Sequence, residues 1–213
     1  MSKPEKGLYN NERRAARAAQ TRWRIIEAAI DSFSARGYAA TTMRDLATAA
    51  GVSVDTVHAN GPKPALLQAA VRVAIFGLES DKPIENYEIW AQLVSLTAPA
   101  EFLDLIEQTF STTMLRVAPL WAAVEVAADG DPDVATRRDE LIAGAVTTLR
   151  ALVRTCAERG WLGGTLTDDQ RIAALYTIGA PGSVHLAQRD LNLDADGYRA
   201  WMRRTLDWAL LGS

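Results

Sequence analysis

Residues 41–60, TTMRDLATAAGVSVDTVHAN, hold two short apolar patterns of helical spacing that are separated by a turn at Gly51. Thr42 followed three residues later by Asp45 forms a capping box, which predicts a helix start, and Gly51 can adopt the left-handed conformation that ends this helix. Ser53 is the predicted cap of a second helix. Two short helices joined in this way form a helix-turn-helix unit, whose second helix presents a polar edge to the DNA major groove. An ordinary αα-corner without a DNA-binding role has the same spacing.

The charge of the chain is unevenly distributed. The net charge is −3 over 213 residues. Residues 1–72 carry 11 Lys and Arg against 6 Asp and Glu, a balance of +5, whereas residues 73–213 carry 12 against 20, a balance of −8. A basic N-terminal third followed by an acidic remainder favours contact with a polyanion at the N-terminal end only. Solvated helix faces can produce the same asymmetry, so charge alone does not decide.

Composition favours an all-α fold with a sizeable core. Hydrophobic residues make up 48% of the chain, and β-branched runs are rare. The single cysteine, Cys156, excludes an intrachain disulfide framework. No apolar stretch is long enough to cross a bilayer, and residues 1–20 lack the apolar segment of a secretory signal. We therefore expect a cytoplasmic protein that does not associate with membranes.

Hydrophobic periodicity predicts about nine helices in total. The first is expected to begin at Asn10 or Asn11 and to end at Gly37, and a fourth is expected to begin at Pro62. Pro119 is expected to start or kink a helix, and Pro181 to kink another. The predicted core stripe of the first helix is Ile25, Ile26, Ala29, Ile30 and Phe33.

Several short motifs follow one another at consistent spacing between residues 21 and 68. They are Ile-Ile-x-Ala-Ala from Ile25, Gly37-Tyr38, Thr41-Thr42, Asp45-Leu46-Ala47, Ala50-Gly51-Val52-Ser53, Thr56-Val57, and Lys63 followed by Leu66-Leu67. With these motifs the segment resembles the DNA-binding part of the tetracycline-repressor (TetR) family of transcriptional regulators. Pro181 and a final Gly-Tyr-x-Ala-Trp-Met helix resemble the dimerisation segment of that family. The middle of the chain resembles nothing in particular.

The resemblance implies three parts. Residues 1–20 would be a flexible basic arm, residues 21–68 a three-helix helix-turn-helix domain, and residues 69–213 a helical bundle for ligand sensing and dimerisation. It further implies a homodimer that binds an inverted repeat in double-stranded DNA and responds to a small, largely apolar effector, with no cofactor, metal or enzymatic activity. We expect repression rather than activation.

The family pattern also assigns DNA-binding roles. Thr41 or Thr42 and Lys63 would hold phosphates, and the side chains at the start of the second helix would face the groove. Asp55 can accept a hydrogen bond from a cytosine amino group, or it can simply stabilise the helix start. His58 stands where the family has tyrosine, the segment from Ala59 to Pro62 is one residue short, and a histidine there predicts binding that changes between about pH 5.5 and 8. The full predicted set is Arg22, Thr41, Thr42, Arg44, Ser53, Val54, Asp55, Thr56, His58, Asn60 and Lys63.

Two further groups of residues are predicted in the rest of the chain. Aromatic and sulfur-containing side chains can line an apolar pocket, with Gln108 or Thr112 as polar groups, although each is also compatible with plain core. Small and large apolar residues of the last helices can form a dimer interface, although they too suit a monomer core. The predicted ligand-binding residues are Trp90, Phe102, Phe110, Met114, Trp121 and Tyr176. The predicted interface residues are Ala173, Thr177, Ala180, Tyr198, Trp201 and Trp208.

An all-helical enzyme and a protein-binding adaptor are the competing functions. The chain has two histidines and one cysteine, and it shows no HExxH motif, no Cys/His cluster with metal-binding spacing and no glycine-rich phosphate loop. These absences argue against an enzyme. Salt-dependent binding to a palindromic duplex would distinguish a regulator from both alternatives.

Overall fold

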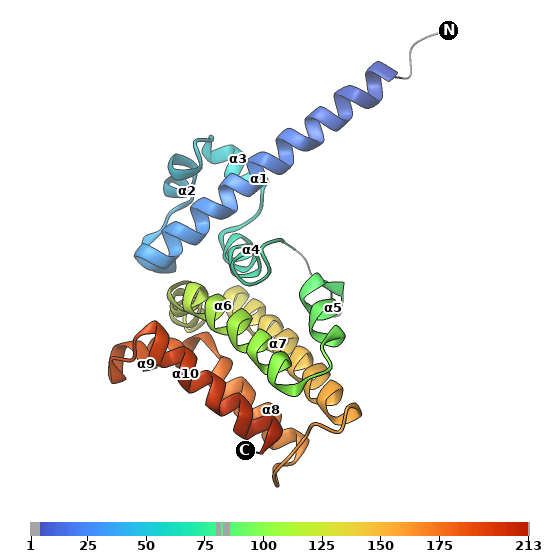
Figure 1. The fold of residues 1–213 in the computed structure, drawn as a ribbon. Coiled ribbons are helices and arrows are strands. Elements are labelled where there is room, and N and C mark those ends of the chain that lie inside the picture. The colour runs from blue at the N-terminus through green and yellow to red at the C-terminus, as the bar shows by residue number, and fades with distance from the viewer. Residues whose placement is uncertain (1–4, 80–81, 83–85, 213) are drawn as a thin grey trace.

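The computed structural model describes residues 5–79, 82 and 86–212, and within those ranges it contains helices and no strand. The helices are α1 (Glu5–Ala40), α2 (Met43–Ala50), α3 (Val54–Ala59), α4 (Lys63–Phe76), α5 (Glu88–Ser95), α6 (Pro99–Ala128), α7 (Pro132–Glu158), α8 (Asp168–Gly179), α9 (Pro181–Leu191), α10 (Ala195–Leu206) and a π-helical turn, η2 (Asp207–Leu211). The predicted all-α class is confirmed. We call α1–α4 the head and α5–η2 the body (Figure 1).

Helix α1 is longer than expected. It begins at Glu5 rather than at Asn10 or Asn11, so residues 5–20 are helical where a flexible arm was expected, and residues 1–4 lie outside the described ranges. The helix projects well beyond the rest of the head (Figure 1). Near its end the helical conformation is interrupted at Gly37, with φ 77° and ψ 170°. A positive φ is accessible to glycine at little cost, which explains a glycine at this position.

Helices α2 and α3 begin and end as the sequence predicts. The Thr42 side chain accepts a hydrogen bond from the Asp45 N–H, and the Asp45 carboxylate accepts one from the Thr42 N–H. Gly51 ends α2 in the left-handed conformation, with φ 65°, and Ser53 caps α3. Helices of eight and six residues are unstable alone, so packing must hold them.

Two prolines act differently in the body. Pro119 was expected to start or kink a helix. It lies inside α6, a single helix of 30 residues, so no new helix starts there. At Pro181 the helix is broken into two separate helices. Helix α8 ends at Gly179, and Ala180 is extended before α9 begins. A residue that precedes proline disfavours the α conformation, and Ala180 obeys this rule.

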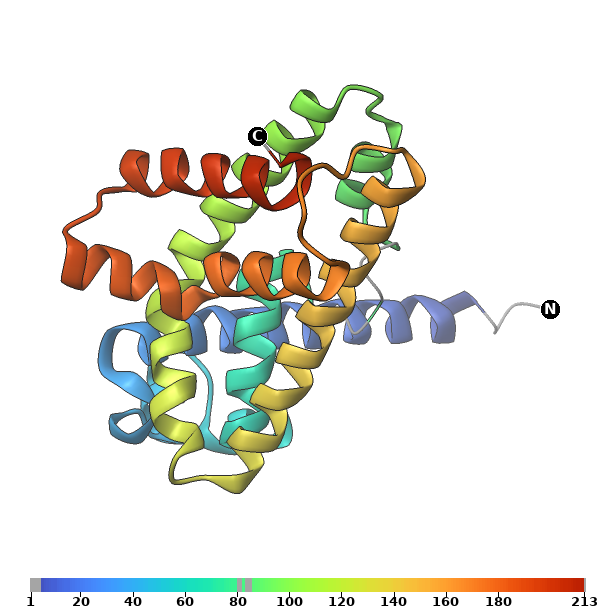
Figure 2. The ribbon, with the colours of Figure 1, turned by 90° about the horizontal axis from the view of Figure 1, so that it is seen from below.

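Helix α6 runs through the centre of the molecule and contacts α1, α4, α7, α9 and α10 (Figure 2). Most buried residues of its second half, among them Val117, Val124 and Ala127, belong to the core that α1–α4 form. Its first half, including Phe102 and Ile106, belongs to a second core shared with α7, α8 and α10. The head therefore packs on the body through a common hydrophobic core. Side chains that are fully buried contribute roughly 1.5–3 kcal/mol each.

A buried arginine in α8 forms hydrogen bonds that link the C-terminal turn η2 to the loop before α8. The Arg171 guanidinium is 3% exposed and donates hydrogen bonds to the carbonyl oxygens of Ala209 (2.5 Å) and Gly163 (2.5 Å). The backbone at Gly163 passes so close to η2 that a Cβ there would lie 1.9 Å from the Leu211 carbonyl oxygen. Glycine is therefore required at this crossing.

Candidate functional site

Helix α3 is anchored by one side chain and exposes its other face. Val57 is fully buried, whereas Asp55 and His58 are exposed and Val54 and Thr56 are partly exposed. The Val54 side chain also packs against the head core. The helix thus holds a polar edge toward solvent, which is the arrangement that major-groove reading requires.

The start of α2 also exposes side chains to solvent. Arg44 is exposed, and the Asp45 carboxylate lies 3.8 Å from the Arg36 guanidinium. The hydrogen bond from the Thr42 hydroxyl holds the pKa of Asp45 below its ordinary value. Thr42 is exposed although its hydroxyl serves the cap. Both Thr42 and Arg44 are accessible to a duplex.

Thr41 is buried, and the prediction that it contacts phosphate is wrong for this residue. Its side chain has no exposed surface, and its hydroxyl donates to the carbonyl oxygens of Gly37 (2.8 Å) and Ser32 (3.2 Å). The hydroxyl therefore bonds to backbone carbonyls of α1 inside the protein. Its role is structural, and Thr42 remains the candidate for a phosphate contact.

Lys63 occupies the first position of α4, where backbone N–H groups lack helical partners and attract anions. Its ammonium lies 4.1 Å from the centre of the Tyr38 ring, and the Tyr38 hydroxyl donates to Asp131 (2.9 Å) in the turn between α6 and α7. Partial burial lowers the pKa of Lys63, and the negative charges of Asp131 and Asp45 oppose this effect. The Lys63 ammonium is therefore positioned by the head and the body together.

Arg22 is already committed to contacts within the protein. Its guanidinium donates to both carboxylate oxygens of Glu79, at 2.9 and 2.5 Å, and to the carbonyl oxygen of Asn60 at 2.5 Å. Asn60 also donates from its side chain to the Thr56 carbonyl (2.8 Å). We call Arg22, Asn60 and Glu79 the Arg22 clamp. It ties the end of α3 to the residue three positions after α4, which makes Arg22 a weaker candidate for phosphate binding than the sequence suggested.

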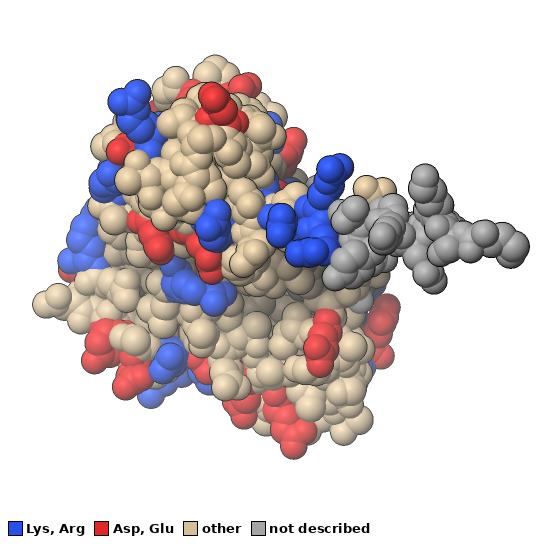
Figure 3. Space-filling view, turned by 90° about the horizontal axis from the view of Figure 1, so that it is seen from above, with Lys and Arg blue, Asp and Glu red and all other residues tan. Residues whose placement is uncertain are grey.

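Charged groups of both signs lie on the face that carries the head. Figure 3 shows basic side chains beside the grey N-terminal residues and at the opposite margin, with acidic side chains between them. On the face seen in this view, the basic side chains do not form one continuous patch.

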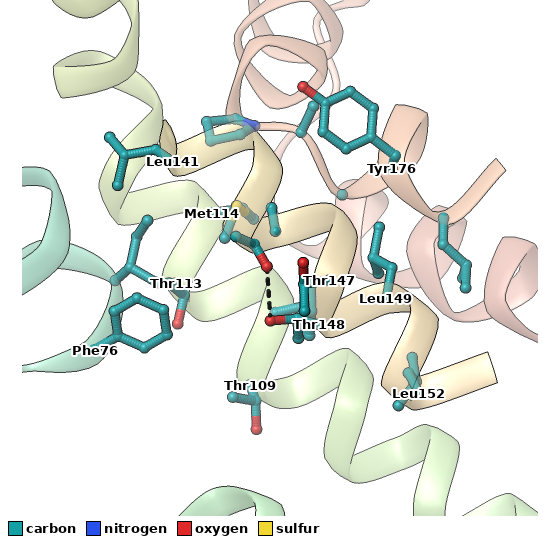
Figure 4. Close-up of a pocket in the computed structure, with 18 of the residues that line it drawn as sticks. Phe76, Thr109, Thr113, Met114, Leu141, Thr147, Thr148, Leu149, Leu152 and Tyr176 are labelled. Carbon is teal, nitrogen blue, oxygen red and sulfur yellow. Dashed lines mark hydrogen bonds between the residues drawn. The ribbon is translucent and has the colours of Figure 1, made fainter. Parts of the chain in front are cut away.

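A cavity of ≈ 620 Å³ lies between α4 of the head and α5, α6, α7, α8 and α9 of the body. Aromatic side chains contribute much of its wall, and hydroxyl groups from α6 and α7 contribute its polar part (Figure 4). The aromatic residues are Phe76, Tyr87, Trp90, Phe110, Trp121 and Tyr176. A cavity of this size and composition suits a drug-sized apolar ligand.

Most of the predicted ligand-binding residues line this cavity. Trp90, Phe110, Met114, Trp121 and Tyr176 do so. The prediction is wrong for Phe102, which is 1% exposed and packs edge-on against Trp161 with ring centres 5.2 Å apart.

The predicted polar groups are displaced by one residue. Gln108 and Thr112 are exposed elsewhere on α6, whereas their neighbours Thr109 and Thr113 line the cavity. Sequence reasoning also missed Phe76, Tyr87, Thr147 and Thr148. The spacing of Thr109 and Thr113, four residues apart within the apolar stripe of Ile106, Phe110 and Met114, was the available signal.

The predicted dimer residues divide by exposure. Ala173, Thr177, Trp201 and Trp208 are exposed, and Ala180 is partly exposed. Tyr198 is fully buried and donates to the Ile178 carbonyl (3.3 Å), so it cannot form part of an interface surface. Its ring lies 5.9 Å from that of Trp201 and supports it from beneath.

No three His, Cys, Asp or Glu side chains gather into a possible metal site in the part of the chain that the structure describes. Among those same residues, no helix combines the length and apolar character that a membrane crossing needs.

The geometry of the head agrees with known proteins. The sequence model of the family "Bacterial regulatory proteins, tetR family" matches residues 25–60, which cover the core of α1 and both helices of the helix-turn-helix. No curated protein matches the chain.

Two solved structures share the fold. One is MexZ, described as a key repressor responsible for antibiotic resistance in Pseudomonas aeruginosa, with 25% identity, a TM-score of 0.56, and coverage of 89% of this chain and 94% of that chain. The other is a mutant of HlyIIR, with 15% identity, a TM-score of 0.59, and coverage of 92% and 100%. Residues 25–60 therefore match the model of the TetR family of bacterial regulators, and the helical bundle that follows them shares its fold with these solved structures.

Proposed function

We propose that the chain is a repressor that binds an inverted-repeat operator as a homodimer and leaves it when a small, largely apolar molecule occupies the cavity. In this account residues 21–68 form the DNA-binding unit and residues 69–213 the ligand-sensing and dimerisation unit. One observation carries the proposal: the same helix, α4, supplies a candidate phosphate contact and a wall of the cavity.

Helix α4 spans 14 residues, a length of about 21 Å. Lys63 is its first residue, and Arg72, Ile75 and Phe76 near its other end line the cavity. A ligand that shifts the end at Phe76 therefore also moves the end at Lys63, because a packed helix moves as a rigid element. The Arg22 clamp joins the chain after α4 to the end of α3, so the reading helix would follow.

A dimer supplies the specificity that one short helix lacks. Each α3 offers only a few side chains to bases, and a two-fold axis would set two copies on successive major grooves about 34–36 Å apart. Exposed apolar surface on the last helices supports association there, since Trp201 and Trp208 are 39% and 51% exposed. Ala173 and Thr177 on α8 allow close approach of a partner helix.

Selection of bound sequences from random duplex DNA tests this proposal. We expect recovery of an inverted repeat whose half-sites are centred about 10–10.5 base pairs apart or a multiple of that distance. Affinity for the recovered site should fall steeply with salt, because phosphate contacts release counterions. Recovery of no enriched sequence, or of a single unrepeated half-site, would contradict the proposal.

A further inference from the structure

The hydroxyl groups of the cavity differ in whether the protein already uses them. On α7, the Thr147 hydroxyl donates to the Ala143 carbonyl (2.9 Å) and the Thr148 hydroxyl to the Gly144 carbonyl (3.2 Å; Figure 4). On α6, the hydroxyls of Thr109 and Thr113 form no hydrogen bond with any residue that the structure describes. The two threonines on α6 therefore have hydrogen-bonding capacity left for a ligand.

A third hydroxyl near the same end of the cavity is also without a partner. The Tyr87 hydroxyl is buried and finds no hydrogen-bond acceptor or donor among the described residues. The Tyr87 ring stacks on Phe76, with ring centres 5.0 Å apart, and Figure 4 shows Phe76 beside Thr113. Because the Tyr87 hydroxyl exposes almost no surface, a ligand in the cavity reaches the hydroxyls of Thr109 and Thr113 instead.

Each charged side chain of the cavity lining already interacts with another group of the protein. Glu140 accepts a hydrogen bond from the Gln68 side chain (2.9 Å). Arg72 and Lys82 both make interactions within the protein. The remaining wall is dominated by aromatic and aliphatic side chains. Burial of a ligand charge in such surroundings is unfavourable without a dedicated counter-ion.

We propose that the effector is an uncharged, flat, largely apolar molecule that carries a hydrogen-bond acceptor of the ketone type, and that Thr109 and Thr113 donate to this acceptor. The inference rests on the proposed function, since it names the class of ligand that the cavity takes. The acceptor lies at the end of the cavity next to α4, so its binding acts directly on the helix that leads to Lys63.

Three naphthalene probes of similar size distinguish the contribution of the carbonyl acceptor to affinity from that of the apolar ring. The first is 6-propionyl-2-dimethylaminonaphthalene, a neutral fluorescent ketone; the second is its 6-propyl analogue, which has no carbonyl acceptor; the third is the anionic 6-dimethylamino-2-naphthoate. Affinities are measured by probe fluorescence with the full-length wild-type protein and with two double variants, Thr109→Val/Thr113→Val and Thr147→Val/Thr148→Val. The second variant makes the same chemical change on α7, where the hydroxyls are already satisfied.

In the α6 variant we expect the affinity for the ketone to fall about fivefold, while affinity for the propyl analogue changes less than twofold. The α7 variant should bind both neutral probes as the wild type does. The emission of the ketone in the wild-type protein should lie to the red of its emission in the α6 variant, because hydrogen bonding to the carbonyl stabilises the polar excited state. Tyr87→Phe should bind the ketone as the wild type does, because the Tyr87 hydroxyl exposes almost no surface to the cavity.

The proposal is overturned if the α6 variant loses both neutral probes equally, if the two double variants behave alike, if the naphthoate binds more tightly than the ketone, or if neither neutral probe binds. These outcomes leave the proposed function intact as long as random-sequence selection recovers an inverted repeat. If the selection recovers no inverted repeat, the proposed function as a regulator is contradicted, whereas the measured preference among the probes remains valid.

Discussion

The head and the cavity are built from contacts of different range. In the head, α2 and α3 begin and end through partners three or four residues away, such as Thr42 with Asp45 and Ser53 with Thr56. The cavity assembles residues from six helices, α4 to α9, between Arg72 and Pro181. Local chemistry decides where the reading edge lies, whereas the ligand wall exists only once distant helices have packed. A single sequence consequently reveals the first more fully than the second.

The largest expected effect concerns the long-range packing of the body. Gly163→Ala places a Cβ 1.9 Å from the Leu211 carbonyl oxygen, and backbone atoms at this crossing cannot move away as a flexible side chain would. We expect a loss of about 3 kcal/mol in the free energy of unfolding. Urea-induced unfolding of the variant and the wild type measures this loss in the free energy of unfolding. Gly144→Ala on α7 is the matched control, because its Cβ meets nothing within 4 Å, and it should stabilise by about 0.5–1 kcal/mol.

A second change separates structural from DNA-contacting threonines. Thr41→Val removes a buried hydroxyl and leaves two carbonyl oxygens without it, so we expect a loss of about 2 kcal/mol in stability. Thr42→Val should lose about 1 kcal/mol, as expected for a helix cap. Only Thr42→Val should change the salt dependence of DNA binding. A changed salt dependence in Thr41→Val, in a protein that remains folded, would restore Thr41 as a phosphate contact.

The contrast between Thr41 and Thr42 also shows what the sequence could and could not predict. Both carry the same hydroxyl, and the family pattern assigned either one to phosphate. Gly37 marked the end of the first helix in the sequence, but no local pattern indicated which of the two threonines after it would be buried. The helix-turn-helix limits, the buried Val57 and most of the aromatic lining were predictable, because capping and periodicity act over a few residues.

Other errors share a physical cause. Phe102 and Tyr198 were assigned to a ligand wall and an interface, but both lie fully inside the second core. Periodicity identifies the apolar face of a helix and does not tell core from cavity on that face. The clamp formed by Arg22 and Glu79 joins residues 57 positions apart and had no signal in the sequence.

The third prediction tests the coupling of α4 to DNA. Lys63→Ala removes an ammonium from the start of the helix, so affinity for all duplexes should fall about five- to tenfold. The slope of log affinity against log salt should become shallower by about one. Filter binding or fluorescence anisotropy across salt concentrations measures both. Arg150→Ala, an exposed change on the body, is the control and should have no effect. An unchanged slope in Lys63→Ala would mean that α4 docks differently.

The smallest effect concerns the Arg22 clamp. Hydrogen bonds from Arg22 hold the pKa of Glu79 below its ordinary 4.5. The folded state therefore binds this proton less readily than the unfolded chain, so the stabilisation is present above pH 4.5 and is lost as the pH falls through the lowered folded pKa. Because the pair is partly exposed, we expect less than about 1 kcal/mol.

Thermal unfolding of the wild type and Glu79→Gln between about pH 3 and 7 measures this effect. The two proteins should differ at neutral pH and converge in acid. A difference that grows as the pH falls would exclude the clamp as its source.

The most direct test of the account is the distance between the two reading helices on DNA. Ala59 is exposed at the end of α3, and the native Cys156 is buried, so a nitroxide label on Ala59→Cys reports this position selectively. With the selected duplex bound, pulsed electron paramagnetic resonance should give one distance distribution centred near 35 Å, the separation of successive major grooves. The absence of dipolar coupling between protomers, or a distance far from one helical turn, would contradict a two-fold pair of α3 helices reading consecutive grooves.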